Sequence, residues 1–215
     1  MKRLIFPILL GLAGCAVLAG LGFWQLQRLD WKQAYLAELE AAAAATPGPL
    51  PETVTSADAY RAVEVSGTVG QGALRFVHAA TDEGLVVPLE LGDRTIMADL
   101  GLIAAGQVPD LAGSEIALTG NLAFPEGSGP LRLDQANGWN ARNLAAMAET
   151  LGTAPVLVVA RTLSPDVPGV APLPISTDTV PNNHLGYAIQ WFALAGVWAA
   201  MSLYLIHRVR RREEG

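Results

Sequence analysis

The segment PNNHLGYAIQWF, residues 181–192, places a histidine where polar sequence gives way to a long apolar run. Neutral imidazole is the usual protein ligand for haem iron, so His184 is a candidate iron ligand. Tyr187 and Trp191 follow His184 at helical spacing, and their rings would suit the apolar face of a porphyrin. The sequence thus allows a haem site in which His184 binds the iron and the two aromatic side chains line the ring.

The same segment has a second, structural interpretation. Asn182 and Asn183 stand just before the apolar run, and asparagine is favoured at helix starts because its side chain accepts hydrogen bonds from the first free amides. A polar group at the edge of an apolar run costs free energy unless it finds such a partner. Asn183 can cap a helix while His184 binds a metal, so the two interpretations are compatible.

A comparable stripe follows the first apolar run at spacings of three and four residues, and consists of Trp24, Gln27, Arg28, Trp31 and Tyr35. Arg28, together with Lys32, would supply the cations that haem propionates need. Tryptophan and tyrosine also gather at membrane interfaces whatever the function, and long basic side chains reach lipid headgroups there. The sequence leaves both interpretations of this stripe open.

The two stripes adjoin two apolar segments, residues 4–24 and 185–206, which contain no Asp, Glu, Lys or Arg. Each is about as long as a helix that crosses the hydrocarbon core of a bilayer. Basic residues precede the first segment and follow the second, so the positive-inside rule places both termini in the cytoplasm. We predict a two-pass protein of a bacterial inner membrane, with a cytoplasmic N-terminus at 1–3, transmembrane helices at 4–24 and 184–206, a periplasmic domain at 25–183 and a basic cytoplasmic tail at 207–215.

LAGC, residues 12–15, gives a different interpretation of the N-terminus, because it resembles a bacterial lipoprotein signal in which Cys15 is lipidated. Apolar sequence continues through Trp24, whereas a lipoprotein usually becomes polar soon after its cysteine. A polar, small-residue cleavage boundary is also lacking, so we prefer an uncleaved membrane anchor.

The middle of the chain argues against an enzyme and against a nucleic-acid partner. Residues 33–183 contain 17 Asp or Glu, 6 Arg and no Lys, and phosphate binding depends on Lys and Arg. This region has one histidine, His78, and no cysteine, which excludes metal cages built from those residues. It contains no nucleophile-elbow, S-x-x-K, dinucleotide or P-loop pattern. We interpret His78 as a strand or loop residue without a special role.

Hydrophobic alternation predicts a small β domain between the two spans. We expect the first helix to continue through the alanine run and to end at TPGP, residues 46–49. Gly92 and Asp93 predict a tight hairpin, and one helix is expected at 140–152, ended by Gly152. Strands are expected at 59–69, 73–79, 85–91, 94–103, 114–122 and 154–163. The fold class is membrane α+β: two transmembrane helices flanking a small, largely antiparallel β domain with one or two helices.

Two motifs at the membrane edges resemble those of the Surfeit-locus family of cytochrome oxidase assembly factors. GFWQLQRLDWK, residues 22–32, is similar to the family's G-x-W-Q-L-x-R-x-x-W-K, and NNHLGYAIQWFALA, residues 182–195, is similar to its N-N-H-L-x-Y-A-x-x-W-F. The resemblance extends between them, through YRAVEVSGTV and NGWNARNLAAMAETLG. The motif positions other than the candidate haem residues are Trp24, Gln25, Arg28, Trp31, Lys32, Asn182 and Asn183.

The resemblance implies a role in building a haem–copper cytochrome c oxidase. It implies that the protein binds haem a through His184 and promotes insertion of the haem into subunit I or its retention there. Haem a synthase and oxidase subunit I are the implied partners. The alternative is an accessory structural subunit that stays with the mature oxidase, uses its aromatic stripes for helix packing and does not handle haem.

One stretch departs from the family pattern. MADLGLIAAG, residues 97–106, stands where the family reads closer to V-N-R-G-W-V-P, so that Leu100 and Leu102 replace an arginine and a tryptophan. If those side chains contact haem or a partner in relatives, this protein makes that contact differently.

Overall fold

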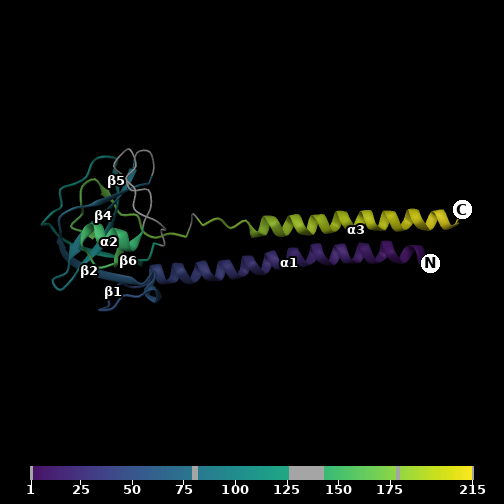
Figure 1. Cartoon of the computed structure of the whole chain (residues 1–215), viewed down its shortest axis with the longest axis horizontal. Helices are drawn as coiled ribbons and strands as arrows, with labels where there is room; N and C mark the ends of the chain where they lie inside the picture. The colour runs from purple at the N-terminus through teal and green to yellow at the C-terminus, as the bar shows by residue number, and fades with distance from the viewer. Residues whose placement is uncertain (1, 79–81, 126–142, 178–179, 215) are drawn as a thin grey trace. The chain divides into compact units, whose positions relative to one another are not determined.

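The structure is a computed structural model that describes residues 2–78, 82–125, 143–177 and 180–214. The chain forms two compact units, Met1–Glu38 with Asp178–Gly215, and Leu39–Thr177. Two long apolar helices make up most of the first unit, and a mixed β-sheet domain with a helix makes up the second (Figure 1). The predicted membrane α+β class is therefore confirmed.

Both terminal helices are long and apolar enough to cross a membrane, which fits a two-pass membrane protein. Helix α1 covers Lys2–Ala44, and helix α3 covers His184–Glu214. As expected, α1 continues far beyond its apolar run and ends just before the TPGP sequence, where Pro47 would leave the helical ladder without a donor. The exact limits of the spans, 4–24 and 184–206, stay predictions.

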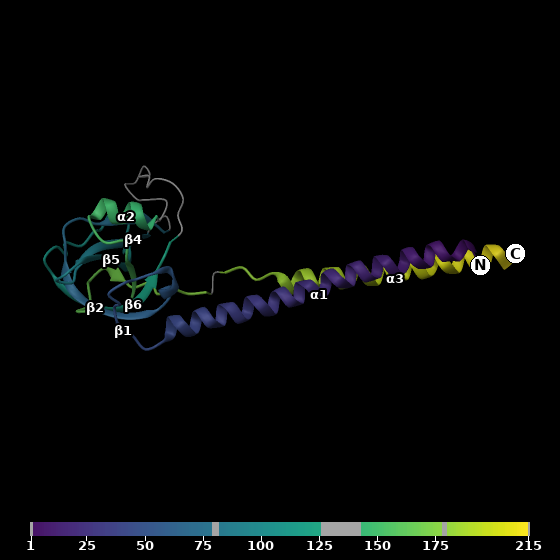
Figure 2. The ribbon, with the colours of Figure 1, turned by 60° about the horizontal axis from the view of Figure 1, so that its bottom comes forward.

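Small residues of α1 face α3 in the first unit, where the two helices lie side by side (Figures 1 and 2). A Cβ added at Gly22 would lie 2.7 Å from the ring of Phe192, and one at Gly11 would lie 2.9 Å from Cβ of Ser202. Gly14 lies against the indole of Trp198 in the same way. Small residues let membrane helices approach closely and gain van der Waals contact, so these glycines are part of the α1–α3 interface.

Five strands of the second unit form a closed sheet. Strand β2 (Ala62–Val69) pairs with β6 (Glu115–Ala123) on one side and with β4 (Asp82–Glu90) on the other. Strands β7 (Leu157–Ser164) and β5 (Thr95–Ala104) complete the circuit, giving the order β2–β6–β7–β5–β4–β2. The β5–β7 pair is parallel, while the other four pairs of the circuit are antiparallel. Three short strands extend the sheet, β1 (Gly48–Pro49) on β2, β3 (Leu74–Val77) on β4 and β8 (Val170–Ala171) on β5.

Alternating side chains fill the inside of this barrel and cover part of its outside. Val63, Val65, Leu85 and Leu100 belong to the buried interior cluster, which confirms the apolar valine face predicted for the first strand. Intervening residues point the other way and pack against helix α2 (Leu144–Leu151), forming a second cluster that includes Val86, Met97, Met147 and Leu157. Because side chains fill its interior, the barrel is a packed core and not a channel.

Helix α2 has the ends that its sequence predicts. Asn143 precedes it, and its side chain accepts a hydrogen bond from the Ala146 amide at 3.2 Å. The helix ends at Gly152, as expected. Residues 140–142 of the predicted helix lie outside the described residues, as does residue 79 of a predicted strand.

The barrel domain binds the last turn of α1 through side chains. Asn121, fully buried on β6, donates from Nδ2 to the carbonyl of Ala43 at 3.1 Å and to that of Tyr60 at 2.8 Å. Arg161 on β7 donates to the carbonyl of Ala45 at 3.2 Å. The last carbonyls of a helix have no partner within it, so these two side chains supply part of the C-terminal cap of α1.

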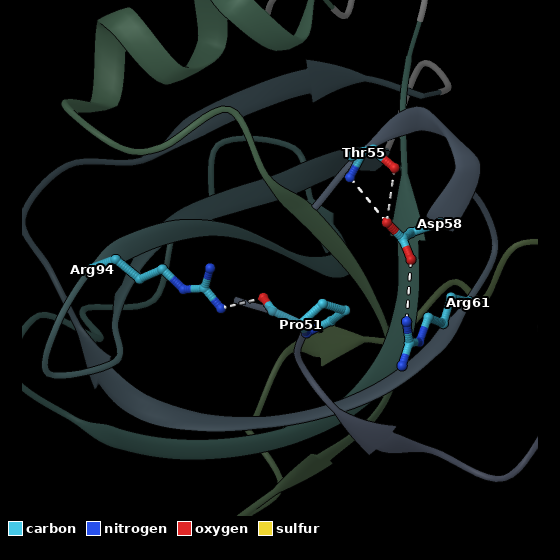
Figure 3. Close-up of polar contacts among 5 residues, drawn as sticks. All are labelled: Pro51, Thr55, Asp58, Arg61 and Arg94. Carbon is cyan, nitrogen blue, oxygen red and sulfur yellow. Dashed lines mark hydrogen bonds and ion pairs between the residues drawn. The ribbon is translucent and has the colours of Figure 1, made fainter. Parts of the chain in front are cut away.

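Arginine side chains also hold the loop between α1 and β2 (Figure 3). Arg94, in the hairpin predicted at Gly92 and Asp93, donates to the carbonyl oxygens of Pro51 at 2.7 Å and Glu52 at 2.6 Å. The hairpin is confirmed by the antiparallel β4–β5 pairing on either side of it. The loop is thus fixed to the end of the barrel by bonds to its backbone.

Asp58 ends a short turn, η1 (Ser56–Asp58), on the same loop. Its carboxylate accepts hydrogen bonds from the Thr55 amide at 3.0 Å and the Thr55 hydroxyl at 3.1 Å, and it pairs with Arg61 at 3.2 Å (Figure 3). The Thr55 amide first, then the Arg61 side chain and the Thr55 hydroxyl, stabilise the charged form and lower the pKa of Asp58 below its usual value.

Replacing Arg61 by methionine is expected to raise the pKa of Asp58 toward the ordinary aspartate value of about 3.9. The pKa of Asp58 is lower in the folded than in the unfolded protein. Ionised Asp58 therefore stabilises the folded state fully above its unfolded-state pKa, and this stabilisation is lost as the pH falls through its folded-state pKa. A carboxyl-carbon NMR titration measures the midpoint. Arg94→Met, which removes a different arginine from the same loop, is the control, and an unchanged midpoint in Arg61→Met would contradict the assignment.

Candidate functional site

The predicted haem ligand, His184, is the first residue of α3. The carbonyl of Asn183 accepts the Tyr187 amide at 3.2 Å, so the helical ladder begins at the two-asparagine segment, while capping by the Asn183 side chain stays a prediction. Oδ1 of Asn182 is buried and has no hydrogen-bond partner among the described residues, so it does not accept from the first amides of α3. The start of α3 therefore relies on other contacts for its position.

Two side chains of α1 provide those contacts within the first unit. Oε1 of Gln25 lies 2.9 Å from Nδ1 of the half-buried His184 ring, which is a hydrogen bond. Nζ of Lys32 donates to the carbonyl of Pro181, just before the helix. Gly22, Gln25 and Lys32 follow one another at spacings of three and seven residues, which is one face of α1. Side chains on this face of the motif at residues 22–32 therefore contact the start of the motif at residues 182–195.

Motif residues on the other faces of α1 are exposed. The guanidinium of Arg28 lies over the ring of Trp31, 4.1 Å from its centroid, and Trp31 stacks on Tyr35 with 5.8 Å between ring centroids. Trp24 is also exposed. Arg28 and Lys32, which the sequence suggested as a pair of propionate-binding cations, thus have different partners in the structure: Arg28 lies on an aromatic ring and Lys32 bonds to a backbone carbonyl.

The aromatic residues of α3 differ in exposure along the helix. Tyr187, one turn after His184, is 51% exposed, and Trp191 is half-buried. Phe192, next to Trp191, makes an edge-to-face contact with Phe23 of α1, with ring centroids 5.3 Å apart. Tyr187 therefore presents a partly exposed ring one turn from His184, while Phe192 belongs to the packing between the helices.

The two positions that depart from the family pattern, Leu100 and Leu102, differ in burial within the β domain. Leu100 is completely buried in the barrel interior, where it contributes to the core. Leu102 is half-buried and lines a pocket of about 360 Å³, together with Tyr60, Asp99 and Leu173. Only Leu102 is thus placed where its side chain can meet a ligand or a partner.

The remaining candidate groups of the domain do not form a site. His78 is exposed and follows the end of β3, consistent with its interpretation as an ordinary loop residue. No group of three or more His, Cys, Asp or Glu side chains in the described part of the chain could hold a metal ion. Glu83 is buried, and it accepts hydrogen bonds from Arg75 at 3.0 Å and from the Gly106 amide at 3.3 Å. These contacts join β3 and β4 to the turn after β5, a structural role.

Sequence reasoning selected Gln25 only as a motif position and missed its bond to His184. The available signal was its spacing from Gly22 and Lys32, which differs from the spacing of the aromatic stripe. That signal becomes interpretable only when the face of α1 that meets α3 is known.

Comparison with known proteins agrees with the motifs. Human Surfeit locus protein 1 is 30% identical over 210 residues, which cover 82% of this chain and 69% of the human protein. The rat protein of the same name is 30% identical over 230 residues, 91% of this chain and 73% of its own length. A SURF1-like protein of Drosophila melanogaster is 27% identical over 227 residues, covering 90% of this chain and 74% of its own length. The SURF1 family profile matches residues 12–196. This chain therefore belongs to the SURF1 family.

Proposed function

We propose that this protein is an assembly factor for a haem–copper cytochrome c oxidase, and that it binds haem a as its cargo through His184. It receives the haem from haem a synthase and promotes its insertion into subunit I or its retention there. The protein performs no chemical step on the haem, so it is a chaperone and not an enzyme. The placement of His184, an imidazole at the start of a membrane-long apolar helix, carries the proposal.

The residues at the start of α3 suit a haem. The bond to Gln25 occupies Nδ1 of His184, while Nε2 has no hydrogen bond to any described residue and can bind a metal. Tyr187 offers an exposed ring one turn away, and Trp191 a half-buried one at the next turn. An imidazole nitrogen beside apolar rings is the donor set that a haem iron and its porphyrin require.

Cations for the propionates come from α1. Lys32 donates to the Pro181 carbonyl, so we assign the propionate role to Arg28, whose exposed guanidinium lies over the ring of Trp31. An arginine fork matches a carboxylate better than an ammonium does. Trp24, Trp31 and Tyr35 then anchor this end of α1 at the membrane interface.

The orientation follows from the basic residues. Arginines near the C-terminus and Lys2 and Arg3 at the N-terminus support an orientation with both ends in the cytoplasm and the acidic β domain in the periplasm of a bacterial inner membrane. This arrangement brings His184 to the outer edge of the bilayer.

A second candidate function is an accessory subunit that remains in the mature oxidase. The exposure of Trp24, Trp31 and Tyr35 favours it, since exposed aromatic side chains also suit packing against another membrane protein. In that case the protein would purify in equal amount with complete oxidase and would carry no haem of its own.

The experiment is a comparison of pigment in two strains. The full-length protein, purified in mild detergent from cells that make haem a, is expected to show a haem a absorbance band and to associate with incomplete subunit I. The same protein from cells that lack haem a synthase is the control and should show no such band. Colourless protein found only with complete oxidase would overturn the proposal in favour of the accessory subunit.

A further inference from the structure

The hydrogen bond between Gln25 and His184 fixes which nitrogen of the imidazole carries the proton. The atom of Gln25 that faces the ring is its amide oxygen, which has lone pairs only and can accept but not donate. With the amide in this orientation, Nδ1, 2.9 Å away, is the N–H donor. A neutral imidazole has one N–H, so Nε2 keeps a free lone pair.

Gln25 is itself held in place. It is half-buried between Gly22, which lies against Phe192, and Lys32, which donates to the carbonyl of Pro181. Contacts on both sides of Gln25 along the helix thus keep α1 and the start of α3 together. A glutamine on a different face, such as the exposed Gln27, has no such surroundings.

We propose that Gln25 is a positioning residue for the haem ligand: it holds His184 in the Nδ1–H form and so presents the lone pair of Nε2 to the iron. A ligating histidine usually donates its second N–H to an outer partner, which fixes the ring and makes the ligand more basic. Here that partner comes from the first membrane helix and the ligand from the second. The inference rests on the proposed function only in that the group bound at Nε2 is a haem iron.

The first arm of the test needs no haem. Full-length protein labelled with ¹⁵N-histidine contains three histidines, and a His184→Ala sample identifies the signals of the one at the start of α3. In the wild type, the ring nitrogen shifts are expected to report the Nδ1–H tautomer. Gln25→Leu should move the ring toward the Nε2–H tautomer, while Gln27→Leu, the matched control, should leave it unchanged.

The second arm uses ferric and ferrous haem added to the same proteins. Gln25→Leu is expected to lower haem affinity about 10- to 100-fold, the usual effect of losing an outer partner. It should also lower the iron–histidine stretching frequency of the ferrous form. Gln25→Glu keeps an acceptor of greater charge, so it should restore affinity and raise that frequency above the wild-type value. A merely structural role for Gln25 would not move the frequency in opposite directions in these two variants.

The two arms separate this inference from the proposed function. If the tautomer of His184 is the same in the wild type and Gln25→Leu, or if Gln27→Leu changes it equally, the positioning role is wrong. A second outcome is that the tautomer depends on Gln25 but haem binds equally well to the wild type and to His184→Ala. The hydrogen bond would then be confirmed, but His184 would not be the haem ligand, and Gln25 could not be its positioning residue. Tautomer and frequency changes in the expected directions support the inference.

Discussion

Protein carrying His184→Ala, purified from cells that make haem a, will lack the haem absorbance band of the wild type. The substitution removes the only iron ligand that we assign, while the bond of Lys32 to Pro181 still holds the start of α3. The loss in affinity should exceed the roughly 100-fold that follows removal of an outer partner, because the ligand itself is gone. Titration of the purified, haem-free protein with haem measures it.

Two comparisons make the His184 result specific. His78→Ala removes an exposed histidine of the β domain and should leave the band unchanged. Imidazole added to His184→Ala should restore part of the band, since alanine leaves space for a free ligand beside Tyr187. A wild-type spectrum from His184→Ala would show that the iron is bound elsewhere, and this part of the proposal would have to be withdrawn.

The largest effect on stability is expected from Gly101→Ala on β5. Gly101 has a φ of +114°, a backbone conformation that costs a residue with a side chain on the order of 1–3 kcal/mol. A Cβ there would also lie 2.5 Å from Cα of Pro172, next to β8, and overpacking adds about 1–3 kcal/mol. Together these amount to a large part of the roughly 5–15 kcal/mol that stabilises an ordinary domain.

Gly106→Ala separates the two causes. Gly106 has a φ of +77°, but a Cβ there would meet nothing within 4 Å. The Gly106→Ala variant should therefore lose only about 1 kcal/mol of its free energy of unfolding, the cost of backbone strain alone. Pulse proteolysis of the full chain across a urea series measures the loss of the β domain in both variants. Equal destabilisation by the two substitutions would rule out the close approach of the Ala171 and Pro172 backbone as the main cause.

Much of the β domain could be predicted from the sequence, because its signals are local. Alternation found the strands, and Gly92 with Asp93 marked the hairpin between β4 and β5. Closure of the barrel could not be predicted in this way. It depends on the pairing of Val69 with Leu89 and on the parallel β5–β7 pair, which join residues distant in sequence through backbone hydrogen bonds. Backbone hydrogen bonds form between residues of almost any type, so the sequence does not indicate which strands they join.

The candidate site divides in the same way. His184 and the aromatic stripes could be selected from residue type and spacing, but the partner of each side chain could not. Arg28 and Lys32 are alike in charge and lie four residues apart, yet one packs on Trp31 and the other bonds to Pro181. Which face of α1 meets α3 decides this, and small residues such as Gly14 and Gly22 mark that face only in retrospect.

The ends of the β domain have a consequence for the pairing of the two membrane helices. Glu40 and Thr177 are hydrogen-bonded although 137 positions separate them. Closing a flexible loop costs roughly 0.6 kcal/mol per doubling of its length. When the barrel is folded, the bond between Glu40 and Thr177 replaces this long loop by a short connection, which we take as about four residues. The unfolded loop is then about five doublings longer than that connection. Folding of the barrel thus lowers the entropic cost of bringing α3 to α1 by about 3 kcal/mol. A barrel that unfolds would weaken the helix pair at a distance, because the effective concentration of one helix around the other would fall.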